Sequence, residues 1–175
     1  MKVYIAKIDY FDPKTWPVLG APYPGKDPEG SRRSISNVAN KLGNDGIALL
    51  VGSKVPRTDR AHRHRLLGAV QCHMALYDTA SVVHPRHLTS THFTRENGAF
   101  RMPYCIPFSY LWRCHKPLIQ AAVPCGDELV DYKNRRQWFI RLTGPQAKVA
   151  LDVLHNMAAP GRQIPRPARG FISDL

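Results

Sequence analysis

The sequence predicts an α+β fold: a small β-barrel of five to six strands with short helices at its periphery. Its 175 residues, of which 43% are hydrophobic, suit one compact domain with a single core. Several segments have the length and alternation of strands, whereas only two have helical periodicity. Strands and helices do not alternate as βαβ units require, so a parallel α/β sheet is not expected.

Five segments have the composition of strands. Residues 2–10 alternate apolar side chains between two faces, and residues 47–53 form a continuous apolar run that predicts burial on both faces. Residues 66–77 are a second long strand candidate, joined to that run by a basic loop. Residues 100–112 are dense in aromatic side chains, but the prolines among them predict short or edge strands. Residues 137–143 alternate again.

Two helices and a tail complete the prediction. Residues 34–42 place an apolar stripe on one face, and residues 145–158 begin with a proline in the first turn of a second amphipathic helix. No linker separates two cores, so residues 1–159 are expected to form one domain. The Pro/Arg-rich residues 160–175 are expected to form a C-terminal tail.

The charge balance predicts a polyanionic partner. Lys and Arg number 25 against 13 Asp and Glu, which gives a formal net charge of +12. A surplus of this size concentrates polyanions and speeds their capture. Nucleic acid is the first expectation and an anionic membrane surface the second, while a charge that only maintains solubility is the alternative. No apolar run of about 18 residues is present, so no membrane span is expected.

The basic loop (residues 54–65) is the clearest candidate for contacts with phosphate. Loops of this kind reach the nucleic-acid backbone well. A solvated loop with no partner is the alternative. The candidate backbone-binding residues share a positive charge in or beside this loop: Lys54, Arg57, Arg60, Arg63 and Arg65.

No catalytic motif stands out. The sequence lacks a glycine-rich phosphate loop, a G-x-S-x-G elbow and an H-E-x-x-H helix. Asp131 and Lys133, with Asp127 or Glu128 upstream, could imitate a metal-dependent nuclease, but they lie too close together in sequence to come from separate strands. We therefore expect a binding module and not an enzyme, with no catalytic residue and no cofactor.

The four cysteines favour reduced thiols in the cytoplasm, because they form no C-x-x-C pair and no secretory signal is evident. Two of them, Cys72 and Cys114, directly precede a histidine. Neighbouring side chains on a strand point to opposite faces, which is a poor geometry for a shared zinc ion. No metal site is expected.

Aromatic residues are the candidates for contact with a base. A base outside its helix needs an aromatic face and a few polar groups at its edge. Trp16 lies in a proline-rich loop, and Trp112 stands beside Arg113 at the end of an aromatic segment. For both, a pocket wall and ordinary packing remain open, whereas the regular alternation around Trp138 favours the core.

One stretch resembles a known family. Residues 33–40 (RSISNVAN) lead into residues 44–53 (NDGIALLVGS), and the chain resumes at residues 66–70 (LLGAV) after the basic loop. This order of a short helix with asparagine, a turn, an apolar strand ending in serine and a strand with glycine resembles the EVE domain of the PUA-like superfamily. Its relatives include the YTH, ASCH and SRA domains.

The resemblance implies a small barrel whose concave side holds one modified nucleobase. Ser53 and Asn37 would line the pocket, Trp16 and Trp112 would be its walls, and Tyr104 would be a weaker candidate. Such domains often accompany modification-dependent restriction systems, so a nuclease is the implied protein partner.

The resulting hypothesis is a DNA-binding module, with RNA as the alternative target, that takes a flipped base into an aromatic pocket. Methylated or hydroxymethylated cytosine is the expected base. Two other hypotheses stay open: a small metal-dependent nuclease or RNA-processing enzyme, and a basic structural protein that binds nucleic acid without regard to sequence.

Overall fold

The protein has an α+β fold with a mixed, mostly open sheet of many strands and a few short helices. A computed structural model describes all residues except 21–27, 54, 57, 91–92, 95–97 and 120–137. The chain divides into two compact units that alternate along the sequence. The first unit contains Met1–Phe11, Asp45–Gln71 and Tyr110–Gln163, and the second contains Asp12–Asn44, Cys72–Ser109 and Ile164–Leu175. None of the described helices has the length and apolar character needed to cross a membrane.

The sheet of the first unit is built on a parallel pair. Strand β1 (Val3–Ile8) runs parallel to β3 (Ile47–Gly52), with Val3 opposite Ile47 and Ile8 opposite Gly52. Strand β7 (Phe139–Arg141) pairs antiparallel with β1, and β4 (Arg65–Cys72) pairs antiparallel with β3. All six residues of β3 are buried, which confirms the predicted burial on both faces. The parallel pair was not expected from the sequence.

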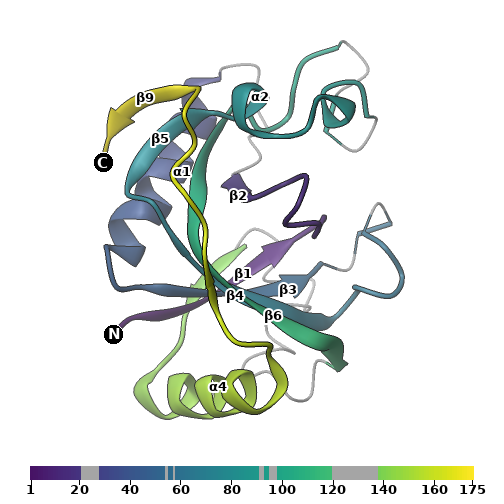
Figure 1. Ribbon diagram of the computed structural model, residues 1–175, viewed down its shortest axis with the longest axis vertical. Coiled ribbons are helices and arrows are strands. Elements are labelled where there is room, and N and C mark those ends of the chain that lie inside the picture. The colour runs from purple at the N-terminus through teal and green to yellow at the C-terminus, as the bar shows by residue number, and fades with distance from the viewer. Residues whose placement is uncertain (21–27, 54, 57, 91–92, 95–97, 120–137) are drawn as a thin grey trace. The chain divides into compact units, whose positions relative to one another are not determined.

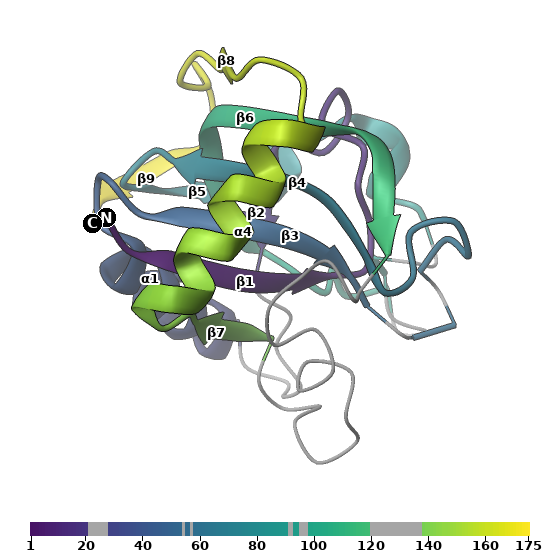
Figure 2. The ribbon, with the colours of Figure 1, turned by 90° about the horizontal axis from the view of Figure 1, so that it is seen from below.

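Helix α4 (Gly144–Met157) covers one face of this sheet and lies across β1 and β3 (Figure 2). Its start is capped, because the Gln146 side-chain oxygen accepts from the Thr143 backbone N–H at 3.0 Å. The buried Ala150 and Leu154 belong to a hydrophobic cluster to which β1 and β3 contribute alternate residues and β4 contributes Leu66 and Ala69. The predicted helix at residues 145–158 is therefore confirmed to within one residue at each end.

Strand β6 (Tyr104–Ile119) runs as one 16-residue strand where the prolines had predicted short pieces. Its residues before Tyr110 belong to the second unit, where they pair with β2 (Val18–Gly20). The ladder continues past Pro107 because the next residue, Phe108, donates its N–H to the Pro17 carbonyl at 3.0 Å. A proline removes only its own donor from a ladder, and here the flanking donor maintains the pairing.

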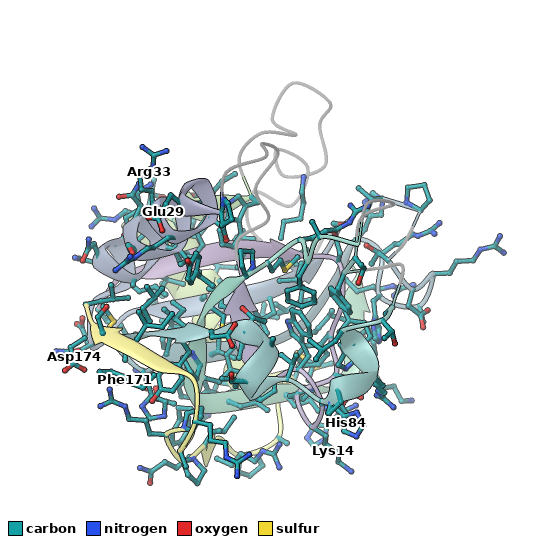
Figure 3. All side chains as sticks on the ribbon, turned by 90° about the horizontal axis from the view of Figure 1, so that it is seen from above. Lys14, Glu29, Arg33, His84, Phe171 and Asp174 are labelled. Atoms are coloured by element: carbon teal, nitrogen blue, oxygen red, sulfur yellow. The ribbon has the colours of Figure 1, made fainter. Side chains whose placement is uncertain are left out.

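In the second unit the short strand β5 (Ala75–Asp78) pairs antiparallel with β6. The predicted strand at residues 66–77 is thus two strands, separated by a tight turn in which Ala75 N–H donates to the His73 carbonyl at 2.8 Å. Helix α1 (Glu29–Leu42) begins five residues before the predicted start, and its Glu29 and Arg33 point outward (Figure 3). Two short helical segments complete this unit: α2 (Thr79–Val82) and η1 (Pro85–His87).

The C-terminal residues carry two strands and are not a separate tail. Strand β8 (Arg162–Gln163) pairs with β6 in the first unit. Strand β9 (Phe171–Asp174) pairs antiparallel with β5 in the second unit, beside which Figure 1 shows it. Strands of two and four residues are too short for a sequence period to reveal them. The closed barrel stays a prediction, because the strand order described here is that of a mostly open sheet.

One arginine fixes the last strand. The Arg166 guanidinium donates to the Tyr77 hydroxyl oxygen at 2.9 Å and to the Asp174 carboxylate at 3.0 Å. Its central carbon also lies 4.9 Å from the centre of the Phe171 ring, a cation–π contact. Phe171 and Asp174 are both on β9 (Figure 3). Arg166 is therefore an anchor for the C-terminal strand.

Candidate functional site

The carboxyl ends of β1 and β3 bring two polar side chains together. Because Ile8 pairs with Gly52, the residues that follow them, Asp9 and Ser53, emerge at the same edge, and the Ser53 N–H donates to the Ile8 carbonyl at 2.8 Å. Ser53 is only 1% exposed, and its hydroxyl donates to the Asp9 carboxylate. The hydroxyl of Thr58, from the basic loop, lies 2.8 Å from the Ser53 hydroxyl. Ser53 therefore connects the two strand ends and the loop.

The basic loop is held in shape by one of its own arginines. The Arg63 side chain donates to the Thr58 carbonyl at 2.9 Å and to the Pro56 carbonyl at 2.6 Å. These bonds commit the Arg63 guanidinium to the loop, although the sequence suggested a phosphate contact. Among the described arginines of this loop, Arg60 is the exposed one, whereas Arg63 and Arg65 are half-buried.

One further contact ties the loop to the sheet, and another closes a turn within the loop. His64 donates its N–H to the Gly52 carbonyl at 3.0 Å and adopts a φ of 55°, a left-handed conformation that is uncommon for a residue other than glycine. Asp59 accepts from the Ala61 N–H at 2.8 Å and so closes a turn beside Arg60. The loop therefore presents its cations from a preorganised backbone.

This edge of the first unit carries an excess of positive charge. Its described residues include two carboxylates, those of Asp9 and Asp59. They also include four cations, those of Lys7, Arg60, Arg63 and Arg65. The predicted contacts Lys54 and Arg57 lie outside the described residues. We call the following set the carboxyl edge: Lys7, Asp9, Ser53, Trp138 and the basic loop, which includes Arg60, Arg63 and Arg65.

Trp138 joins the carboxyl edge through β7. The Lys7 N–H donates to the Trp138 carbonyl at 2.7 Å, which extends the pairing of β7 with β1 by one residue. Trp138 is half-buried, and its backbone lies opposite Lys7, which precedes Asp9 by two residues. The sequence favoured a core position for Trp138 because the residues around it alternate as in a regular strand. That alternation does not show which strand β7 pairs with, so it could not place Trp138 at this edge.

Trp16 is packed inside the second unit. It is 6% exposed and its ring is stacked on Phe93, with centres 4.1 Å apart and planes inclined by 13°. His87 meets the indole edge-on at 5.5 Å. A base could stack on the face that Phe93 covers only by displacing Phe93.

A polar network fixes His87 beside this aromatic cluster. The Thr15 hydroxyl donates to the Asp12 carboxylate at 2.9 Å, so the His87 Nε2, 3.0 Å away, donates to the hydroxyl oxygen. Burial lowers the pKa of His87, and the positive charge of Arg86 lowers it further. Burial raises the pKa of Asp12, but its hydrogen bonds and the charge of Arg86 outweigh burial and leave that pKa below its usual value. The network therefore holds a neutral histidine and an ionised carboxylate.

The remaining predicted pocket residues are divided between the units. Trp112 is half-buried in the first unit, packed against the hydrophobic cluster, and its ring centre lies 4.6 Å from that of Tyr110. The backbone at Gly161 passes so close that an added Cβ would lie 2.5 Å from the Trp112 Nε1. Asn37 is exposed on α1 and Tyr104 is half-buried at the start of β6, both in the second unit.

Three cysteines of the described part of the chain have buried thiols. Cys72, Cys105 and Cys114 are free and buried. Burial raises the pKa of all three, to about 12 for Cys105 and about 11 for Cys114, so they remain protonated. Within the described part of the chain, no group of three or more His, Cys, Asp or Glu side chains could hold a metal ion. The nuclease-like residues Asp127, Glu128, Asp131 and Lys133 lie outside the described residues.

Comparisons with known proteins add little to this description of the site. No family model matches the sequence, and no curated protein matches it. An NMR structure of a Rhodopseudomonas palustris protein, a structural-genomics target, is similar with 15% sequence identity and a TM-score of 0.42. The match covers 89% of this chain and 94% of that chain.

Proposed function

We propose that this protein is a nucleic-acid-binding module that uses the carboxyl edge of its first unit. The observation that carries this proposal is a basic loop fixed by internal hydrogen bonds and anchored to two strand ends by Ser53. A preorganised loop loses little conformational freedom when a partner binds, so more of its electrostatic attraction appears as affinity. The formal net charge of +12 adds long-range attraction for a polyanion.

The function proposed for this edge is the reading of one modified base. The order of residues 33–53 and 66–70 resembles that of EVE-type domains, and this resemblance supports both a PUA-like barrel and a methylated or hydroxymethylated cytosine as the ligand. A flipped base also needs an aromatic face, and stacking contributes about 1–3 kcal/mol per base. Trp138 and Trp112 are the half-buried indoles of the first unit.

The residues of the edge have separate roles in this proposal. Arg60 and Arg65 contact phosphates, Arg63 maintains the loop, and Ser53 orients the carboxylate next to it. DNA is the proposed target, with a nuclease as partner, in the cytoplasm.

A binding panel tests the proposal. The full chain is titrated by fluorescence anisotropy with oligonucleotides that differ at one base: cytosine, 5-methylcytosine, 5-hydroxymethylcytosine, adenine or N6-methyladenine. Each is offered as single-stranded DNA, duplex DNA and RNA. We expect one modified base to bind about tenfold more tightly than its plain form, and log Kd to rise with log salt. Equal affinities across the panel would instead support a basic protein that binds without regard to modification.

The nuclease hypothesis is separated by its product. The same oligonucleotides are incubated with the chain and Mg²⁺, with and without a chelator. Intact oligonucleotides are expected in both samples. Cleavage that the chelator stops would replace the binding-module proposal by a metal-dependent nuclease.

A further inference from the structure

Gly52, the last residue of β3, is in close contact with the backbone of the basic loop. An added Cβ at this position would overlap the His62 carbonyl oxygen, and it would lie 2.6 Å from the His62 carbonyl carbon and 3.3 Å from the Arg63 backbone nitrogen. Gly52 and Arg63 also form a parallel bridge. A glycine within a strand often marks a place where another backbone approaches closely. Gly52 therefore leaves the space in which the loop returns to the sheet.

Space, and not backbone conformation, is what requires a glycine at this position. Gly52 is not one of the described glycines with a positive φ. Its register opposite Ile8 is that of an ordinary parallel strand pair, so the backbone here could accept an alanine if nothing lay over it. A role in relieving backbone strain is therefore excluded, and the contact with the loop is the feature that a side chain would disturb.

The loop, and not the strand, would yield to a side chain at position 52. Gly52 is buried, and β3 lies in the sheet between β1 and β4, with which it pairs on its two sides. The residue after it, Ser53, donates its N–H to the Ile8 carbonyl at 2.8 Å. His62 and Arg63 are only half-buried and belong to a loop. A Cβ on Gly52 would therefore displace the loop from the sheet.

That displacement would carry Arg60 with it. The His62 carbonyl, which lies on Gly52, belongs to a turn that starts at Asp59, because the His62 N–H donates to the Asp59 carbonyl at 2.9 Å. Arg60 is in this turn and is exposed. After the turn, the His64 N–H donates to the Gly52 carbonyl at 3.0 Å. The position of Arg60 relative to the strand ends is thus set by the contact on Gly52.

We infer that Gly52 is a positioning residue of the nucleic-acid site: because it has no side chain, the loop rests on the end of β3 and presents Arg60 to the phosphates of the ligand. The inference rests on the proposed function, because it assigns the residue that sets the geometry of the same basic loop. It adds that the loop has its binding shape before the ligand arrives, so nucleic acid meets an arm that is already folded.

The test combines two substitutions in a double-mutant cycle. Anisotropy gives the Kd of the oligonucleotide that the wild-type chain binds most tightly, over a series of salt concentrations, for the wild-type chain, Gly52→Ala, Arg60→Ala and the double variant. We expect Gly52→Ala to lower the slope of log Kd against log salt by at least about one unit, because the phosphate contact of Arg60 is lost. The double variant should then bind no more weakly than Gly52→Ala alone. An unchanged slope in Gly52→Ala, or losses that simply add in the double variant, would overturn the inference.

Gly68→Ala is the matched control. Gly68 is a buried glycine of the neighbouring strand β4, where an added Cβ would overlap the Trp112 carbonyl oxygen on β6 and not the loop. The change should lower the free energy of unfolding, as Gly52→Ala does, but leave the salt slope unchanged. An equal loss of slope in Gly68→Ala would assign the effect to loss of packing in general and refute the inference. A wild-type chain that binds no oligonucleotide refutes the proposed function itself, whereas a chain that binds through Arg60 and tolerates Gly52→Ala refutes only the role of Gly52.

Hydrogen exchange in the wild-type chain gives an answer that needs no variant. The His64 N–H donates to the Gly52 carbonyl, so this amide should already be protected from exchange in the free chain. The same measurement is repeated with the oligonucleotide bound. Fast exchange in the free chain that slows only in the complex would show that the ligand folds the loop. That result would overturn the inference even if Gly52→Ala failed to fold.

Discussion

Ser53→Ala is the substitution whose cost can be worked out most directly from the structure. The change removes one hydroxyl from a position that is 1% exposed. That hydroxyl donates to the Asp9 carboxylate, and a hydrogen bond to a charged group contributes about 1.5–3 kcal/mol. The Thr58 hydroxyl, 2% exposed, loses its neighbour at 2.8 Å, and a buried group left without a partner costs about 1–3 kcal/mol.

The two contributions overlap because water can enter where the hydroxyl was, so we expect a loss of about 2–4 kcal/mol in the free energy of unfolding. Urea denaturation followed by circular dichroism measures this loss. Native-state hydrogen exchange should also show faster exchange at the Ala61 and His64 amides, which belong to the loop that Ser53 anchors. Ser36→Ala, on the half-buried side of α1, is the matched control, with an expected change below about 0.5 kcal/mol. A loss below about 0.5 kcal/mol in Ser53→Ala would refute the anchoring role.

Three further predictions concern charge, pH and the thiols. Arg60→Ala should weaken the binding of all oligonucleotides alike and reduce the slope of log Kd against log salt by about one unit. Arg63→Ala should weaken binding and should in addition lower the free energy of unfolding, as urea titration would show, because its side chain holds the loop carbonyls. Because the pKa of His87 is lowered in the folded chain, the unfolded chain binds more protons, so stability should fall as the pH drops below the ordinary histidine value of 6.5. The pKa of Asp12 is also lowered, so its stabilisation is complete above pH 3.8 and should be lost as the pH falls further. Melting temperatures between pH 8 and pH 3 measure both losses. The variant His87→Gln should remove the loss that begins below pH 6.5. The three buried cysteines should resist iodoacetamide at pH 8 and react in urea, as peptide mass spectrometry would show; rapid labelling of the native chain would contradict their burial.

The elements that the sequence predicted well are those whose signal is local. The continuous apolar run of β3 and the amphipathic period of α4, with its proline in the first turn, each contain all the information that identifies them. The start of α1 was missed because its first turn, Glu29 to Arg32, is polar and adds nothing to the apolar stripe. Strand β9 was missed because its partner, β5, lies about a hundred residues earlier in the chain.

The candidate site was predictable only in part, for the same reason. Composition pointed to the basic loop and the resemblance to EVE-type domains pointed to Ser53, and both are found together at one edge. The sequence did not reveal that Arg63 would turn back onto the loop carbonyls, because Arg60 and Arg63 look alike in a basic segment. The roles of two arginines three residues apart are decided by the fold of the loop.

The largest omission was the parallel pairing of β1 with β3, and it determines the chemistry of the site. An antiparallel pair would have placed Asp9 and Ser53 at opposite edges, whereas the parallel register brings the residues after Ile8 and Gly52 to one edge. The antiparallel addition of β7 then places Trp138 at that edge, although it follows Asp9 by well over a hundred residues. An acceptor, an indole and a cationic loop thus meet through strand register, which no single segment of the sequence encodes.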